Sequence, residues 1–236
     1  MRNIPAITAH EIRSAFLSPL AYAVLTIFLF CSGLLFVLAT TGTMTATLDG
    51  YIFSLTGLIL VATPLLTMRL LSEEYRSGTI EPLRTAPVTD TDVILGKYFG
   101  ALIFFALMLA PTWIYVLILF TLGEPDIGPI LSSYLGVLLM GAQFLALGLF
   151  CSALTRSQLV AGMLALVLLV VIWVLGAIGE WIVGPFAPVL CYIGTYEHIM
   201  NFIKGQIVFR DIFYFLSLTV FWLFLAVRAL ESKRWR

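Results

Sequence analysis

The residue types that usually carry catalysis, metal binding or nucleotide binding are sparse in this chain. Its two histidines, His10 and His198, are too few and too far apart for a histidine metal site. There is no HExxH or GxSxG motif, and the one Gly-Lys pair, at 96–97, precedes tyrosine instead of the serine or threonine of a P-loop. Three widely spaced cysteines form neither a disulfide framework nor a metal-binding pattern: Cys31, Cys151 and Cys191. We therefore expect no catalytic residue, metal site or cofactor in this chain.

One pair of polar residues stands apart from this general picture. His198 directly follows Glu197 in a segment that is otherwise rich in apolar residues. On an exposed face, such a pair could contact a substrate or a metal ion. A solvated pair, or one satisfied within a helix, is the simpler interpretation.

The densest polar feature is the stretch from Met68 to Tyr98. Gly78 suits the position just after a helix end, and Thr79 suits the start of a new, short helix. Glu81 would lie in the first turn of that helix, where a carboxylate complements the helix dipole, and Pro87 would end it. The pattern predicts a short helix between two long ones.

Both flanks of this short helix carry helix-boundary signals. Residues 72–76, Ser-Glu-Glu-Tyr-Arg, are typical of the polar end of a long helix. Thr89 and Asp92 have capping-box spacing, which predicts the start of the next long helix. An ordinary solvated loop whose charges only satisfy topology would also explain this composition.

The elements around this loop are predicted to cross a membrane. The chain is 61% hydrophobic and 11% charged, with a mean hydropathy of +1.06, whereas soluble domains carry roughly 25% charged residues. A spanning helix needs about 20 apolar residues. We expect a single all-α membrane domain over residues 1–236, with six transmembrane helices near 20–39, 51–71, 95–122, 129–154, 158–178 and 210–230. None of these stretches has a charged residue at its centre.

Two further segments flank the spans. Residues 1–19 show a modest helical pattern, with Ile4, Ile12, Ala15 and Phe16 opposite His10 and Arg13, which predicts an interfacial helix and not a removable signal peptide. A disordered leader is the alternative. Residues 179–209 are apolar in places but are interrupted by glycine and proline. They predict short interfacial or re-entrant helices, because irregular backbone cannot face lipid.

The basic residues predict the orientation in the membrane. Six spans put both termini on one side, and eleven of the thirteen Lys and Arg residues fall on that side: Arg2, Arg13, Arg69, Arg76, Arg84, Lys97, Arg156, Arg228, Lys233, Arg234 and Arg236. The positive-inside rule makes this side cytoplasmic. We therefore expect a multi-pass protein of the cell inner (cytoplasmic) membrane. The zero net charge gives no reason to expect a nucleic-acid partner.

The polar loop also carries a family resemblance. The run EEYRSGTIEPLRTAPVTDTDVILGKYFGAL resembles the coupling-loop signature of ABC-2 type permeases: an acidic pair, a basic residue, Gly-Thr, Glu, Pro-Val or Pro-Ile, and Gly-Lys. The matching residues are Glu73, Glu74, Arg76, Gly78, Thr79, Glu81, Pro87, Val88, Gly96 and Lys97. Pro82 departs from the pattern, which usually has leucine there. Within the family, the gliding-motility-associated permease and the nitrous-oxide-reductase maturation permease are the most similar.

The resemblance implies a transporter subunit without enzymatic activity of its own. Residues 72–94 would form a coupling loop that docks into a separate ABC ATPase subunit, which binds ATP and Mg. The implied interface comprises Glu73, Glu74, Tyr75, Arg76, Gly78, Thr79, Ile80, Glu81 and Leu83, with Ile80 and Leu83 as apolar anchors. It further implies export, a dimer with a second copy or a related permease, contact with membrane lipid, and an auxiliary subunit with an extracytoplasmic domain.

Small residues in the fourth predicted span allow close helix packing. They are Gly136, Gly141 and Gly148, together with the Ala142-x-x-x-Ala146 pattern, and they could mark the seam of a dimer. Small residues are common in any such helix.

Other functional classes remain as alternatives. A self-contained channel or secondary carrier would need intramembrane polar sites or broken helices. Pro64 and Pro111 could break helices, although a kink satisfied by neighbouring helices is the simpler interpretation. A non-transporting membrane anchor would not stimulate an ATPase. A membrane enzyme is disfavoured by the absence of a clustered nucleophile, base or metal ligands.

Overall fold

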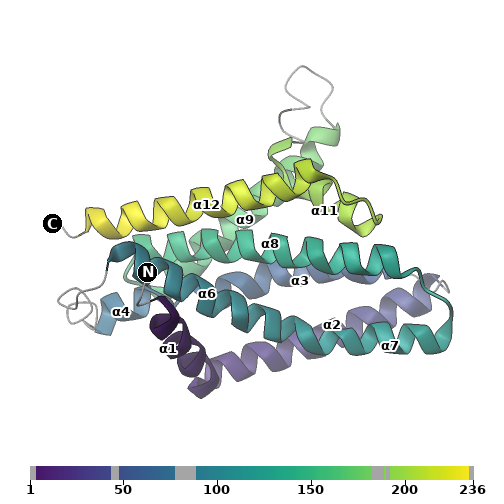
Figure 1. Cartoon of the computed structure of the whole chain (residues 1–236), viewed down its shortest axis with the longest axis horizontal. Helices are drawn as coiled ribbons and strands as arrows, with labels where there is room; N and C mark the ends of the chain where they lie inside the picture. Colours follow the sequence, from purple (N-terminus) through teal and green to yellow (C-terminus); the bar gives the residue numbers. More distant parts are fainter. Residues whose placement is uncertain (1–3, 44–47, 78–88, 182–188, 190–191, 234–236) are drawn as a thin grey trace.

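The computed structural model describes residues 4–43, 48–77, 89–181, 189 and 192–233, and every regular element in these residues is a helix. Six segments are long and apolar enough to cross a membrane, as predicted. They are formed by α2 (Pro19–Thr43), α3 (Asp49–Thr67), α6 (Asp90–Leu109) with α7 (Trp113–Leu122), α8 (Ile127–Leu154), α9 (Gln158–Trp181) and α12 (Phe209–Ser232). Figure 1 shows most of them running side by side along the longest axis.

Helix α8 forms the centre of the bundle and is in contact with α3, α6, α9, α11 (Thr195–Ile203) and α12. Its small residues allow this close packing. An added Cβ would lie 2.6 Å from Phe202 at Gly136, 2.2 Å from Phe105 at Gly141 and 2.0 Å from Thr67 at Gly148. Ala142 and Ala146 are also buried. The small residues therefore serve packing within one chain, and the suggestion that they mark a dimer seam is wrong.

The third span is broken near its middle. Helix α6 ends at Leu109, a 3₁₀ turn follows over Ala110–Thr112 with Pro111 inside it, and α7 continues from Trp113. The hydroxyl of Thr112 donates to the Leu109 carbonyl (2.6 Å), and the Tyr134 hydroxyl of α8 donates to the Thr112 carbonyl (3.1 Å). A neighbouring helix thus satisfies the break, as expected for proline in a spanning helix. Pro64 lies inside α3 without ending it.

The N-terminal segment is a regular helix, α1 (Ile4–Leu17), which packs against the first turns of α6. The hydroxyl of Thr8 donates to the Gly96 carbonyl (3.1 Å). An added Cβ would lie 2.7 Å from Ile7 at Gly96 and 2.7 Å from Glu11 at Gly100. The alternative of a disordered leader is therefore wrong. The contact uses Ile7, Thr8 and Glu11, which the predicted apolar face left out, because it is made with a helix and not with lipid alone.

The two ends of the bundle differ in what they carry. Helix α1, the short helix α4 (Ser72–Ser77) and the C-terminal end of α12 lie at the same end, on the left in Figure 1, which we call the loop end. Helix α11 lies toward the opposite end, which we call the outer end (Figure 1). Helix α11 is one short helix of the kind predicted for residues 179–209, although α9 continues to Trp181 and so takes up the first three residues of that segment.

Candidate functional site

The base of the polar loop is formed by α4, which follows α3 after a short turn. The four residues Glu73–Arg76 of α4 divide between two sides. Glu73 and Arg76 are exposed, whereas Glu74 and Tyr75 are half-buried against the bundle. The acidic pair of the signature is therefore split, with one carboxylate outward and one inward.

The inward carboxylate belongs to a cluster of three charges. The Nζ of Lys97 in α6 lies 2.8 Å from Oε1 of Glu74 and 3.1 Å from Oε2 of Glu11 in α1. The Lys97 side chain is only 6% exposed, and those of Glu11 and Glu74 are 18% and 25% exposed. A lysine buried to this degree is tolerated only when it is paired. The cluster therefore fastens α4 to α1 and to α6 at the same point.

A serine of the central helix fastens the turn between α3 and α4. The hydroxyl oxygen of Ser152 accepts hydrogen bonds from the backbone N–H groups of Leu71 (3.0 Å) and Ser72 (3.1 Å). The same hydroxyl donates to the Met68 carbonyl (3.2 Å). These backbone groups lie at a helix end, where regular helical partners are missing. One buried side chain of α8 therefore fixes the position of the turn.

Two further contacts extend this anchorage to the chain's end and to the elbow between α1 and α2. The ammonium of Lys233, just after α12, lies 4.2 Å from the centre of the Tyr75 ring, within cation–π range. The guanidinium of Arg69 donates to the Ser18 hydroxyl (2.5 Å). The loop base is thus joined to helices from the beginning, the middle and the end of the sequence.

The structure describes only part of the predicted interface. Glu73, Glu74, Tyr75 and Arg76 lie together on α4, while the other predicted residues lie outside the described residues: Gly78, Thr79, Ile80, Glu81 and Leu83. At the far side of the loop the predicted cap is present, because the Thr89 hydroxyl accepts from the Asp92 N–H (3.2 Å). Helix α6 begins directly after it, at Asp90, earlier than the predicted start of that span near residue 95.

Sequence reasoning missed the partners of Glu74. From the sequence, Lys97 belongs to the cytoplasmic charges and to the family signature, and Glu11 belongs to the predicted interfacial helix. The two are 86 residues apart, so no local spacing connects them. The available signal was weaker: Lys97 stands beside an apolar run, where an unpaired charge would be costly.

The structure also separates the two members of the predicted pair Glu197 and His198 and gives each a different partner. His198 lies 2.7 Å from Asp211, and it is Arg210 that lies near Glu197, at 3.9 Å. Among the described residues, no group of three His, Cys, Asp or Glu side chains could hold a metal ion. Proximity in the sequence pointed to Glu197, but the carboxylate that the fold brings to His198 comes from α12.

The six candidate spanning segments are those of a multi-pass membrane protein. Comparison with family models agrees: residues 36–210 match the ABC-2 family transporter protein. The match covers most of the chain, so the protein belongs to the ABC-2 transporter family and is a membrane subunit of an ABC transporter. No match was found among curated proteins.

Proposed function

We propose that this chain is the permease subunit of an exporter, that it works as a dimer, and that it is driven by a separate ATPase subunit docked on residues 72–94. The observation that supports this proposal best is the anchorage of the loop base. Glu74 is ion-paired with Lys97 and, through it, linked to Glu11, while Ser152 holds the preceding turn. A push on the loop would therefore reach α1, α6 and α8 together.

The proposal divides the loop residues into two roles. Glu73 and Arg76 are exposed on α4 and suit electrostatic contacts with the ATPase, which set orientation and specificity. Glu74 and Tyr75 are turned toward the bundle and act as positioning residues. The predicted helix that starts at Thr79 would supply the apolar anchors Ile80 and Leu83 and a further charge at Glu81.

The remaining parts of the proposal follow from the family. ATP and Mg would be bound by the ATPase, and this chain would supply the path and the mechanical linkage. Six spans are few for a complete path, so a second copy or a related permease would complete it at their interface. The loop end would face the cytoplasm of the inner membrane, and an auxiliary subunit with an extracytoplasmic domain would bind the outer end. The gliding-motility or nitrous-oxide-reductase subgroup is proposed on the loop sequence alone.

The test is co-purification of the tagged full chain from native membranes in mild detergent, followed by mass spectrometry and an ATPase assay. We expect a stoichiometric ABC ATPase with the wild-type chain. Glu73→Lys and Glu81→Lys should each reduce its recovery severalfold without changing the unfolding temperature of the permease. The matched control is Glu231→Lys, which reverses an exposed carboxylate at the same end but outside the loop.

Two outcomes would overturn the proposal. If no ATPase accompanies the wild-type chain under gentle conditions, the chain acts alone, as a channel, a carrier or an anchor. If an ATPase is recovered equally well with Glu73→Lys, Glu81→Lys and Glu231→Lys, the subunit docks elsewhere. Chemical cross-linking of the purified complex would test the dimer separately, since an ATPase-bound monomer would contradict only that part.

A further inference from the structure

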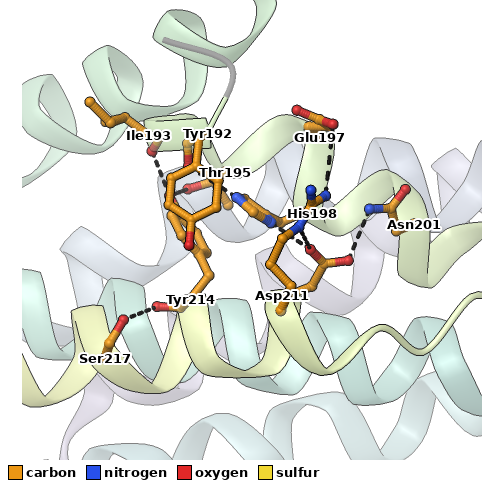
Figure 2. A network of polar contacts seen from close by, with 10 residues as sticks. Tyr192, Ile193, Thr195, Glu197, His198, Asn201, Asp211, Tyr214 and Ser217 are labelled. Carbon is orange, nitrogen blue, oxygen red and sulfur yellow. Dashed lines mark hydrogen bonds and ion pairs between the residues drawn. The ribbon is translucent and has the colours of Figure 1, made fainter. Parts of the chain in front are cut away.

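The outer end contains a buried polar network that the coupling function does not use. Figure 2 shows His198 of α11 between Asp211 of α12 and the backbone of Tyr192. The Nδ1 of His198 lies 2.7 Å from Oδ1 of Asp211, and its Nε2 lies 3.0 Å from the Tyr192 carbonyl oxygen. His198 and Asp211 are each 0% exposed. Neither His198 nor Asp211 can therefore exchange these partners for water without local opening.

The arrangement of oxygen atoms around His198 suits an imidazolium. A neutral imidazole has one N–H and one bare nitrogen, whereas an imidazolium donates from both nitrogens. Both nitrogens of His198 face oxygen acceptors. Asp211 is itself an acceptor on its other sides, because Asn201 Nδ2 donates to Oδ2 (2.9 Å) and Arg210 Nε donates to Oδ1 (3.4 Å). An ionised Asp211 and a His198 that carries both protons would satisfy all of these contacts.

The surroundings contain few other charges. The Tyr214 ring stacks on the imidazole, with ring centres 3.9 Å apart, and the Tyr192 ring lies edge-on at 5.4 Å. Arg210 is half-exposed and lies 3.9 Å from Glu197. In the described residues, α3, α8 and α9, which pack on α11, place no charged side chain in ion-pair contact with His198 or Asp211. The proton on His198 is therefore balanced mainly by Asp211.

The network holds a defined piece of backbone in place. His198 donates to the Tyr192 carbonyl, and the Tyr214 hydroxyl donates to the Ile193 carbonyl (2.6 Å). Without the second proton, a bare nitrogen of His198 would face an oxygen, and Asp211 would lose its main counter-charge in a buried site. Both changes are costly in a buried environment. Loss of the proton would favour separation of residues 192–198 from α12.

We propose that His198 and Asp211 form a proton-binding site that latches residues 192–198 onto α12. With the proton bound, the latch is closed. As the pH at the outer end rises, Nε2 of His198 loses its proton to water and its hydrogen bond to the Tyr192 carbonyl is lost. The latched segment then separates from α12. The outer end of the permease thereby responds to the pH of the compartment it faces.

The first test observes the proton directly in the full-length wild-type chain. The protein is labelled with ¹⁵N-histidine and studied by NMR in lipid nanodiscs; since the chain has two histidines, His10→Gln assigns the signals. Exposed His10 is the internal control. We expect both ring nitrogens of His198 to carry a proton at mildly acidic pH, and one proton to be lost on raising the pH. A His198 ring with a single N–H throughout would overturn the proposal, and this measurement requires no variant of the site.

The second test observes the latch. Amide hydrogen exchange of residues 192–198 is measured from about pH 5 to about pH 8, the range in which histidine titrates, with correction for intrinsic exchange. We expect protection in the wild type to fall at least tenfold as the pH rises. Asp211→Asn should be weakly protected at every pH, and Glu197→Gln, the matched control, should behave as the wild type. Equal profiles for the wild type and Asp211→Asn would overturn the latch.

Discussion

The two ends of the bundle each bury a carboxylate against a cation, but with different chemistry. At the loop end, Lys97 is held by two carboxylates that are 18% and 25% exposed. At the outer end, His198 faces one carboxylate, and both are fully buried. Lysine stays charged throughout the physiological pH range, whereas histidine titrates within it. The first arrangement suits a permanent mechanical joint, and the second suits a joint that depends on pH.

The largest effect is expected from removing the cation of the loop end. Lys97→Met would leave Glu11 and Glu74 facing each other in a half-buried site, and breaking a buried pair in this way costs about 3–5 kcal/mol. The unfolding temperature in detergent should fall markedly at every pH. Lys204→Met, which removes an exposed lysine, is the control. An unchanged unfolding temperature in Lys97→Met would show that the cluster adds no stability.

The next prediction tests whether stability depends on pH at the outer end but not at the loop end. Asp211→Asn leaves His198 without its carboxylate and should cost about 1–3 kcal/mol, the penalty for an unsatisfied buried polar group. The sign of its pH dependence follows from the proton: the wild-type latch is complete at low pH and is lost as pH rises. The difference in stability between the wild type and Asp211→Asn should therefore shrink with increasing pH. The difference in stability between the wild type and Lys97→Met should not change with pH. If both differences change with pH in the same way, the two ends do not differ in their pH dependence.

A smaller effect is expected from separating α1 from α6 without touching a charge. At Gly96 an added Cβ would lie 2.7 Å from Ile7, so Gly96→Val must displace α1, and overpacking typically costs about 1–3 kcal/mol. Limited proteolysis should then release α1 faster than in the wild type. Gly57→Val is the matched control, since nothing lies within 4 Å of its added Cβ. Equal proteolysis of the two variants would show that the α1–α6 contact is loose.

An effect of comparable size concerns the turn between α3 and α4. Ser152→Ala removes the hydroxyl that accepts from Leu71 and Ser72, and each such hydrogen bond contributes about 1 kcal/mol. The two lost hydrogen bonds amount to about 2 kcal/mol, so the unfolding temperature should fall, and ATPase stimulation should fall more than stability if this turn transmits motion. Ser217→Ala, whose hydroxyl bonds only to its own helix, is the control. A loss of stimulation proportional to the loss of stability would assign Ser152 a purely structural role.

Much of the fold could be predicted from the sequence, and less of the site. The Thr89 cap and the satisfied break at Pro111 were predictable because both depend on residues close in the chain or on a backbone defect that any neighbour can repair. Of the interface, the helical conformation and the charges of residues 72–76 were predictable, but these residues form a separate helix, α4, and not the end of the second spanning helix, because α3 ends at Thr67. The inward direction of Glu74 was not, because it depends on Lys97 and Glu11, which other elements supply.

The sequence by itself determined the six candidate spans and the polar loop, because the length of an apolar stretch and the positions of charges can be read locally along the chain. Only the tertiary structure decided which faces of the helices meet. In a soluble helix the polar face marks the outside, but here lipid-facing and core-facing positions are equally apolar, so periodicity does not fix the rotation of a helix. Those rotations decide which residues contact Lys97, His198 and the glycines of α8. These contacts can therefore be known only from the folded bundle.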